Sequence, residues 1–368
     1  SPWNYPLFLC AAPALHALVA GNAVVLKGSP RTAGTVRVFG EWLYAAGIPQ
    51  ELAPVIDSSD DAGRALVASP RVNRIVFTGG SRTGRAVLTA AAQNLTPATV
   101  ELSGFDAVFI LRDADLQLAA AGVTFGLRLN AGRTCICPRR VFVEEAVSAE
   151  FITRRKQRLS THKLLEPMDP LTLKEADALA ARLKEVPGAE SLNNRQPGDA
   201  TSALAYLGDN AALAAAQGNF VPAIVVTKVK DVEEALRLEA ATPYALGGSI
   251  FSRDAASVSK LAARLRPGLI SVNDCVAQGG EAALPMGGTG ESGYGVRCGE
   301  EGLLEMTRPQ ALAFPRGSFR PHHDAEEETE AMMVALLRAR HSGKLFQRLK
   351  GWIDFAREGI KWRPKPRS

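Results

Sequence analysis

Short β-branched runs alternate with stretches rich in Ala and Leu over the first hundred residues of the chain. The apolar runs at 23–26, 52–56 and 74–78 predict strands, and the stretches at 32–46 and 61–68 predict helices. Strands that alternate with helices build a parallel sheet, which helices cover on both faces. We therefore predict an α/β fold whose ligands bind at the carboxyl ends of the strands.

A second α/β segment is predicted between about residues 107 and 265. Its strands are indicated by apolar runs at 108–111, 140–143, 223–226 and 248–251, with helices between them. The intervening region 154–199 is rich in Lys, Glu and Gln, and we expect it to form surface helix and loop.

The composition changes after residue 316, where an acidic run at 324–330 precedes a helical pattern. Leu345, Leu349, Trp352, Ile353 and Phe355 recur there among basic residues. We favour an amphipathic helix that packs on its own protein or on a sister subunit. A basic amphipathic helix that lies on a membrane surface is the alternative.

Composition limits the class of protein further. With 368 residues and 46% hydrophobic content the chain can bury a large core, and its length suggests two or three domains. A formal net charge of +5 could indicate a nucleic-acid partner, but much of the excess lies in 338–367, so we predict no nucleic-acid binding.

The five cysteines show neither the density of a disulfide framework nor a Cys-x-x-Cys zinc spacing, so we predict no metal site. This usage fits a reducing, cytoplasmic compartment. No signal-peptide pattern opens the chain, and no apolar run is long enough to span a bilayer.

Five short segments then narrow the function. They are Pro2-Trp3-Asn4-Tyr5-Pro6, Phe77-Thr78-Gly79-Gly80 through Gly84, Val100-Glu101-Leu102, Asn130-Ala131-Gly132-Arg133-Thr134-Cys135 and Glu291-Ser292-Gly293-Tyr294-Gly295. In this order and spacing they resemble the NAD(P)-dependent aldehyde dehydrogenase superfamily, whose nucleophile is a cysteine. The resemblance covers roughly residues 1–310, and implies that the N-terminal part of the family's fold is missing and that the protein is a homo-oligomer.

The resemblance also implies a domain arrangement. Residues 1–104 would form a partial Rossmann-type NAD(P)-binding domain, and 105–266 an α/β catalytic domain with the nucleophile. Residues 267–310 would return to the domain interface, and 311–368 would be a helical C-terminal extension.

Three catalytic residues are implied for a small-molecule aldehyde substrate. Cys135 stands at the nucleophile position, Glu101 matches the glutamate that activates water, and Asn4 matches the asparagine that donates to the developing oxyanion. Arg133 replaces the family's glutamine, and it would either lower the pKa of the thiol or pair with an acid elsewhere.

The implied cofactor is NAD or NADP. Its predicted binding residues are Trp3, Lys27, Ser29, Arg31, Gly79, Gly80, Gly84, Leu102 and Phe220. The glycines follow a strand and precede a helix, where backbone amides can bind a pyrophosphate. A Walker A loop is disfavoured because Arg85 and Ala86 follow Gly84.

Several positions depart from the family pattern. Pro30 and Gly218 replace glutamates that contact the two riboses, while Ser103 and Phe105 alter the segment after Glu101. A glutamate at position 30 would repel the 2′-phosphate of NADP. Because Pro30 stands there with Arg31 beside it, NADP would be favoured. Together the departures leave open a catalytically weakened homologue that acts as a scaffold or partner subunit. An acyl transfer to coenzyme A is disfavoured by the retained Glu101.

Overall fold

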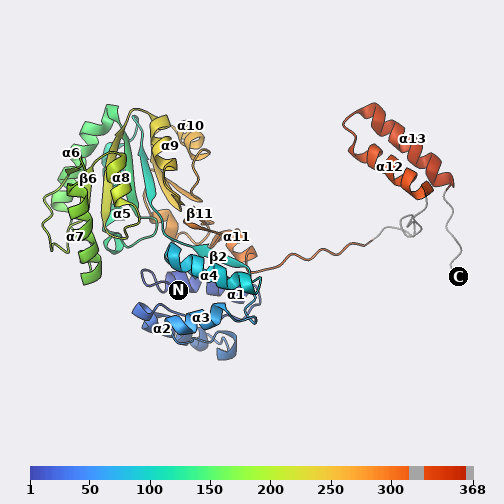
Figure 1. The fold of residues 1–368 in the computed structure, drawn as a ribbon, viewed down its shortest axis with the longest axis horizontal. Helices are drawn as coiled ribbons and strands as arrows, with labels where there is room; N and C mark the ends of the chain where they lie inside the picture. Colours follow the sequence, from blue (N-terminus) through green and yellow to red (C-terminus); the bar gives the residue numbers. More distant parts are fainter. Residues whose placement is uncertain (315–326, 362–368) are drawn as a thin grey trace. The chain divides into compact units, whose positions relative to one another are not determined.

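The computed structural model describes residues 1–314 and 327–361. The chain divides into two compact units, Ser1–Arg308, here called the main unit, and Pro309–Ser368, the C-terminal unit. Each is a body of its own (Figure 1). The predicted α/β class is confirmed in the main unit, which is built around parallel strands. The finer division of the main unit at 104 and 266 stays a prediction.

The N-terminal part of the main unit carries helices around a small sheet. Its elements are α1 (Phe8–Val19), η1 (Pro30–Thr32), α2 (Ala33–Ala45), η2 (Gln50–Leu52), α3 (Asp60–Val67), β1 (Ile75–Thr78), α4 (Ser81–Gln93) and β2 (Ala98–Glu101). β1 and β2 pair in parallel, and β12 (Gly293–Tyr294) adds an antiparallel partner to β2. A late segment of the chain therefore lies beside the strand that ends at Glu101.

The predicted strands at 23–26 and 52–56 do lie side by side, but they form only an isolated bridge between Leu26 and Val55. The Leu26 N–H donates to the Pro54 carbonyl at 2.9 Å, and the Ile56 N–H donates to the Leu26 carbonyl at 3.0 Å. Pro54 has no N–H to donate, and no other strand of the described residues extends the pairing. These segments are thus extended without becoming regular strands.

The main core surrounds a seven-stranded sheet with the order β10-β9-β3-β4-β7-β6-β5. Its strands are β3 (Asp106–Ile110), β4 (Pro138–Glu144), β5 (Glu190–Ser191), β6 (Leu204–Leu207), β7 (Ala223–Val229), β9 (Gly247–Phe251) and β10 (Leu269–Val272). All neighbours are parallel except β5 and β6. Every residue of β4 is buried, as expected for a central strand covered on both faces.

Helices fill the connections of this sheet. They are α5 (Leu116–Arg128), α6 (Glu145–Thr161), α7 (Pro170–Lys184), α8 (Asn210–Ala216), α9 (Val232–Ala240) and α10 (Ala255–Ala262). Figure 1 shows α6 and α7 on one side of the sheet and α9 and α10 on the other. The predicted α/β alternation of 107–265 is therefore confirmed.

The polar region 154–199 is less superficial than its composition suggests. Leu179 and Leu183 of α7 are fully buried, and Arg155 of α6 is fully buried as well. Arg155 donates from Nη1 to the Thr124 hydroxyl at 2.6 Å. The expectation of surface helix and loop was wrong for these faces, because Leu residues at helical spacing turn one side of α7 into the core.

The end of the main unit returns to the N-terminal part through short elements. These are β8 (Tyr244–Ala245), η4 (Ala277–Gly280), β11 (Thr289–Gly290), β12 and α11 (Gly299–Leu304). The Leu102 N–H donates to the Ser292 carbonyl at 3.0 Å, and the Ser292 hydroxyl donates to the Ser103 carbonyl at 2.7 Å. This return places β12, and Ser292 just before it, next to β2 and the residues that follow it.

The C-terminal unit contains a hairpin of two helices, α12 (Glu327–His341) and α13 (Leu345–Lys361). The predicted helical pattern is confirmed by α13, whereas the acidic run begins at 324–326, outside the described residues. A Cβ added to Gly351 would lie 2.4 Å from the Ala339 backbone nitrogen, so the helices touch there. None of the helices in 1–314 and 327–361 has the length and apolar character that crossing a bilayer requires.

Candidate active site

Cys135 lies on the loop that joins η3 (Leu129–Gly132) to β4. All five cysteines of the chain fall in the described part, and Cys135 alone among them is half-buried while the others are buried. Burial raises the pKa of the Cys135 thiol to about 11; Arg297 opposes the rise, and Glu101 and Asp106 add to it. Cys135 is therefore the most exposed of the five cysteines.

Glu101 ends β2 and is almost completely buried. Gly104, three residues later, allows this segment to meet the nucleophile loop, because a Cβ there would lie 2.4 Å from the Cys135 carbonyl oxygen. Burial raises the pKa of Glu101 to about 7, and the opposing influence is Arg297. Oε1 of Glu101 has no hydrogen-bond partner within the described residues, which leaves it able to accept a proton.

Arg297 supplies the positive charge of this site. Its Nε lies 3.6 Å from Oε2 of Glu101, and both side chains are almost fully buried. The rest of the guanidinium contacts sulfur: Nη2 donates to Met286 at 3.0 Å and Nη1 to Cys298 at 3.5 Å. Because sulfur is a weak acceptor, Glu101 is its main electrostatic partner. Sequence reasoning missed Arg297, although it stands two residues after the recognised Gly295.

Asn4 joins the nucleophile loop from the N-terminal segment. Its Nδ2 donates to the Arg133 carbonyl at 3.0 Å, and Asn130 donates from Nδ2 to the Asn4 carbonyl at 2.8 Å. Tyr5 and Thr134 share a hydroxyl hydrogen bond of 2.7 Å beside them. An amide nitrogen carries two hydrogens, so Asn4 keeps one donor after this contact. The three predicted catalytic residues thus belong to segments that touch around one loop.

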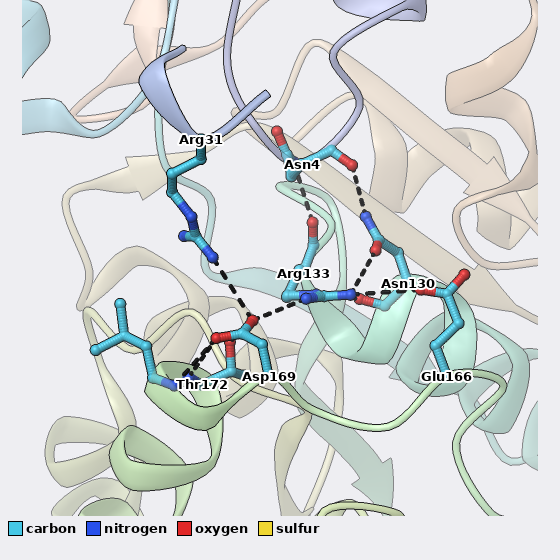
Figure 2. Close-up of polar contacts among 8 residues, drawn as sticks. Asn4, Arg31, Asn130, Arg133, Glu166, Asp169 and Thr172 are labelled. Atoms are coloured by element: carbon cyan, nitrogen blue, oxygen red, sulfur yellow. Dashed lines mark hydrogen bonds and ion pairs between the residues drawn. The ribbon is translucent and has the colours of Figure 1, made fainter. Parts of the chain in front are cut away.

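Arg133 pairs with an acid, the second of the two roles that its sequence position left open. Its Nη1 donates to Asp169 Oδ2 at 2.8 Å, and its Nη2 donates to Asn130 Oδ1 at 3.1 Å, as Figure 2 shows. Burial alone would raise the pKa of Asp169, but hydrogen bonds from Thr172 and Arg133 hold it at about 2. The cation that favours the Cys135 thiolate is Arg297 instead.

Two other predicted cofactor residues, Arg31 and Phe220, contact the ring of Trp3. The Arg31 guanidinium lies 3.7 Å from the centre of that ring, and Phe220 meets the same ring edge-on at 6.0 Å. Arg31 also reaches to 3.7 Å from Asp169 (Figure 2). The N-terminal part and the part that carries the nucleophile loop are therefore linked through Arg31, Asp169 and Arg133.

The predicted glycines surround the start of α4. A Cβ on Gly84 would lie 2.5 Å from Leu102, so the helix packs closely on the residue after Glu101. Gly80 caps α4 without a side-chain hydrogen bond, and a Cβ added to it would meet no atom within 4 Å. No capping side chain accepts hydrogen bonds from the first backbone N–H groups of α4. These N–H groups fit a pyrophosphate, which helix N-termini bind through backbone N–H groups.

The remaining cofactor candidates, Lys27 and Ser29, directly precede η1. Ser29 caps η1 by accepting from the Arg31 N–H at 3.3 Å, and the Lys27 side chain lies along Gly63 of α3. Gly218 adopts a φ of +79°, a left-handed conformation that favours glycine. The backbone itself therefore differs from what a glutamate at this position would prefer. No group of three His, Cys, Asp or Glu within the described ranges could hold a metal.

Comparison with known proteins places this geometry in a family context. The sequence model described as "Aldehyde dehydrogenase family" matches residues 1–188 and 204–312. A 4,4'-diapolycopene aldehyde oxidase from Methylomonas is 32% identical over 320 residues, covering 84% of this chain and 60% of the relative. An aldehyde dehydrogenase from Deinococcus radiodurans is 32% identical over 318 residues, covering 80% and 61%.

Solved structures agree in fold. The chain superposes on a Mycobacterium tuberculosis aldehyde dehydrogenase complexed with NAD+ with a TM-score of 0.79 and 26% identity, covering 86% of this chain and 68% of that one. The chain spans 60% and 61% of the length of the two curated relatives named above.

Proposed function

Because the chain belongs to the aldehyde dehydrogenase family, we propose that it oxidises an aldehyde to a carboxylic acid with NAD or NADP. The observation that carries the proposal is the convergence of the sole half-buried cysteine, Cys135, with Glu101 and Asn4. A thiol, a carboxylate with its pKa near 7 and an amide donor are the groups that this reaction uses.

The Cys135 thiolate attacks the carbonyl carbon, and a carbon–sulfur bond forms while the carbonyl electrons move to oxygen. The free hydrogen of the Asn4 amide and the backbone N–H of Cys135 stabilise that oxyanion. A bound nicotinamide would supply the hydride acceptor for this carbon, and a thioester would then remain on Cys135. Glu101 then takes a proton from water, which attacks the thioester and releases the acid and the thiolate.

Arg297 stabilises both anions of this reaction, the Cys135 thiolate and the Glu101 carboxylate. Its charge opposes the rise in pKa that burial imposes on Glu101 and on Cys135. For the cofactor, the start of α4, which no side chain caps, would hold the pyrophosphate, and the cluster of Trp3, Arg31 and Phe220 would contact another part of the molecule. Choice of NADP through Arg31 requires Arg31 to exchange its contact with Asp169 for a phosphate.

The test is reduction of NAD and NADP, followed by nicotinamide absorbance with short aliphatic, long aliphatic and aromatic aldehydes. Turnover is expected to disappear in Cys135→Ala. Cys137→Ala is the matched control, because Cys137 is buried two residues away and is expected to keep turnover. Addition of coenzyme A leaves the rate unchanged if water is the acyl acceptor. Turnover that survives Cys135→Ala would refute the mechanism.

The second candidate is a catalytically weakened homologue, and Gly218 favours it specifically. A left-handed glycine there offers no carboxylate to the nicotinamide ribose. A folded chain that binds NAD or NADP in calorimetry but reduces neither would support this candidate over the enzyme.

Compartment, assembly and substrate complete the proposal. All five thiols are free, which supports a reducing cytoplasm, and the family resemblance supports a homo-oligomer. The name of the Methylomonas relative supports a large apolar aldehyde, and the half-exposed Phe125 on α5 is compatible with such a substrate. The aldehyde panel above tests this preference.

A further inference from the structure

The two units differ completely in net charge. Residues 309–368 contain 12 Lys and Arg against 7 Asp and Glu, so the whole formal charge of +5 lies in the C-terminal unit. The main unit is formally neutral, with 31 basic and 31 acidic residues. Any partner selected by long-range electrostatics therefore meets the C-terminal unit first.

Within the hairpin, α13 uses one face against α12. Gly351 is buried at the contact with Ala339, and Arg348 donates from Nε to the Ala339 carbonyl at 3.3 Å. Asp354 lies 3.6 Å from Arg338 of α12, so this acidic side chain is paired with a cation of the same hairpin. These contacts define which side of α13 is occupied.

A second face of α13 is apolar and is not used by the hairpin. Its residues recur at intervals of three and four and are exposed, among them Leu345 at 73%, Leu349 at 56%, Trp352 at 47%, Ile353 at 62% and Ile360 at 82%. Side chains at this spacing form one stripe along a helix. We call these five residues the α13 stripe. Of the five apolar residues that the sequence singled out, Phe355 alone lies outside it.

Basic side chains border the α13 stripe. Phe346, Lys350, Ile353 and Arg357 succeed one another at spacings of four, three and four, so that apolar and basic groups alternate along one edge. Both Lys350 and Arg357 are exposed. An apolar stripe edged by Lys and Arg, with a Trp on the stripe, is the composition of a helix that lies in the interface of a lipid bilayer.

We propose that the C-terminal unit docks on an anionic lipid surface through the α13 stripe, with Lys350 and Arg357 against the headgroups. The main unit carries no net charge to attract this edge, and a second copy would oppose it with the same cations. An anionic bilayer supplies both an apolar layer and opposite charge. The apolar residues enter the acyl boundary, and the helix stays parallel to the surface.

The test is co-sedimentation of the full chain with vesicles of phosphatidylcholine alone and of phosphatidylcholine with one quarter phosphatidylglycerol. We expect binding to the anionic vesicles to be at least about tenfold stronger and to weaken with added salt. Leu349→Gln with Ile353→Gln is expected to abolish binding; both positions are exposed, and circular dichroism checks that helicity is kept.

Two control variants carry the same chemical changes in the main unit. Leu118→Gln removes an exposed apolar side chain of α5 and should leave binding intact. Lys350→Glu with Arg357→Glu is expected to abolish binding, whereas Lys174→Glu with Lys184→Glu, on exposed positions of α7, should retain it.

Absence of binding, equal binding to neutral vesicles, or loss of binding in the control variants overturns the proposal. So does a lipid-free dimer, seen by light scattering, that the stripe variants dissociate, since a second copy would then be the occupant.

Discussion

The main unit and the C-terminal unit place charge and apolar surface in opposite positions. The main unit buries two ion pairs, Glu101 with Arg297 and Arg140 with Glu239, whose side chains are each about 3% to 5% exposed. In the C-terminal unit none of the charged side chains of residues 329–360 is buried, and a stripe of large apolar residues is exposed as well. Burying a charge is costly and an exposed apolar stripe is unusual. We propose catalysis as the role of the Glu101–Arg297 pair and lipid binding as the role of the α13 stripe.

The largest effect that sharpens this comparison is expected from Glu101→Gln. Loss of a general base lowers kcat by about 10² to 10⁴. Acylation of Cys135 does not need this base, so one equivalent of reduced cofactor should still form in a rapid burst. Stopped-flow absorbance measures burst and steady state together, and Glu175→Gln on an exposed site of α7 serves as control. A variant without a burst would contradict the assignment of Glu101 to deacylation.

The second effect is a displaced pH profile in Arg297→Met. Glu101 acts as a base when ionised, so the rate rises as pH increases through its pKa of about 7. Without the neighbouring cation that pKa rises, and the profile should move to higher pH by about one unit or more. Alkylation of Cys135 by iodoacetamide should shift in the same direction, independently of turnover. Arg297→Lys should restore part of the shift, and an unchanged profile would remove Arg297 from the site.

Gly351→Leu is expected to destabilise the C-terminal unit without affecting the main unit. The new side chain would meet the Ala339 backbone at the helix contact, and overpacking of this kind costs about 1–3 kcal/mol. We expect faster hydrogen exchange in α12 and α13 and unchanged exchange in the main unit. Gly343→Ala is the control, because no atom lies within 4 Å of its added Cβ. Equal exchange in both variants would show that the close contact is dispensable.

The smallest effect concerns the conformation of the main-unit backbone. Gly218→Ala forces a Cβ into a left-handed residue and should lower the free energy of unfolding by about 1–2 kcal/mol. Gly80→Ala, at a negative φ with open space around it, should cost nothing. Urea denaturation compares the two. Equal stabilities would mean that Gly218 is not held in this conformation.

The fold was predictable where burial leaves a simple pattern. Strands at 108–111, 140–143, 223–226 and 248–251 are confirmed, because a parallel sheet covered on both faces requires continuous apolar runs. The prediction of two strands around Leu26 and Val55 was wrong, because these residues form only an isolated bridge. An apolar run does not show whether a ladder of backbone hydrogen bonds continues. The burial of Arg155 was not predicted, because its charge suggested a solvent-exposed side chain, yet the residue is fully buried.

The site was predictable to the extent that its residues lie within recognisable motifs. Cys135, Glu101 and Asn4 were found in this way, and their roles stay predictions until the experiments above are made. Arg297 was not found, because its partner Glu101 is remote in sequence and an isolated arginine looks like surface charge. The left-handed φ of Gly218 was equally invisible, since periodicity carries no information about single loop residues.

The neutrality of the main unit has a further consequence for the behaviour of the protein in solution. Molecules without net charge do not repel one another, and solubility is lowest under that condition. The 12 basic and 7 acidic residues of 309–368 therefore provide the charge that keeps separate molecules apart near pH 7. On an anionic surface the same charge would be neutralised. We therefore expect the same basic side chains to keep the protein soluble and to attach it to the surface.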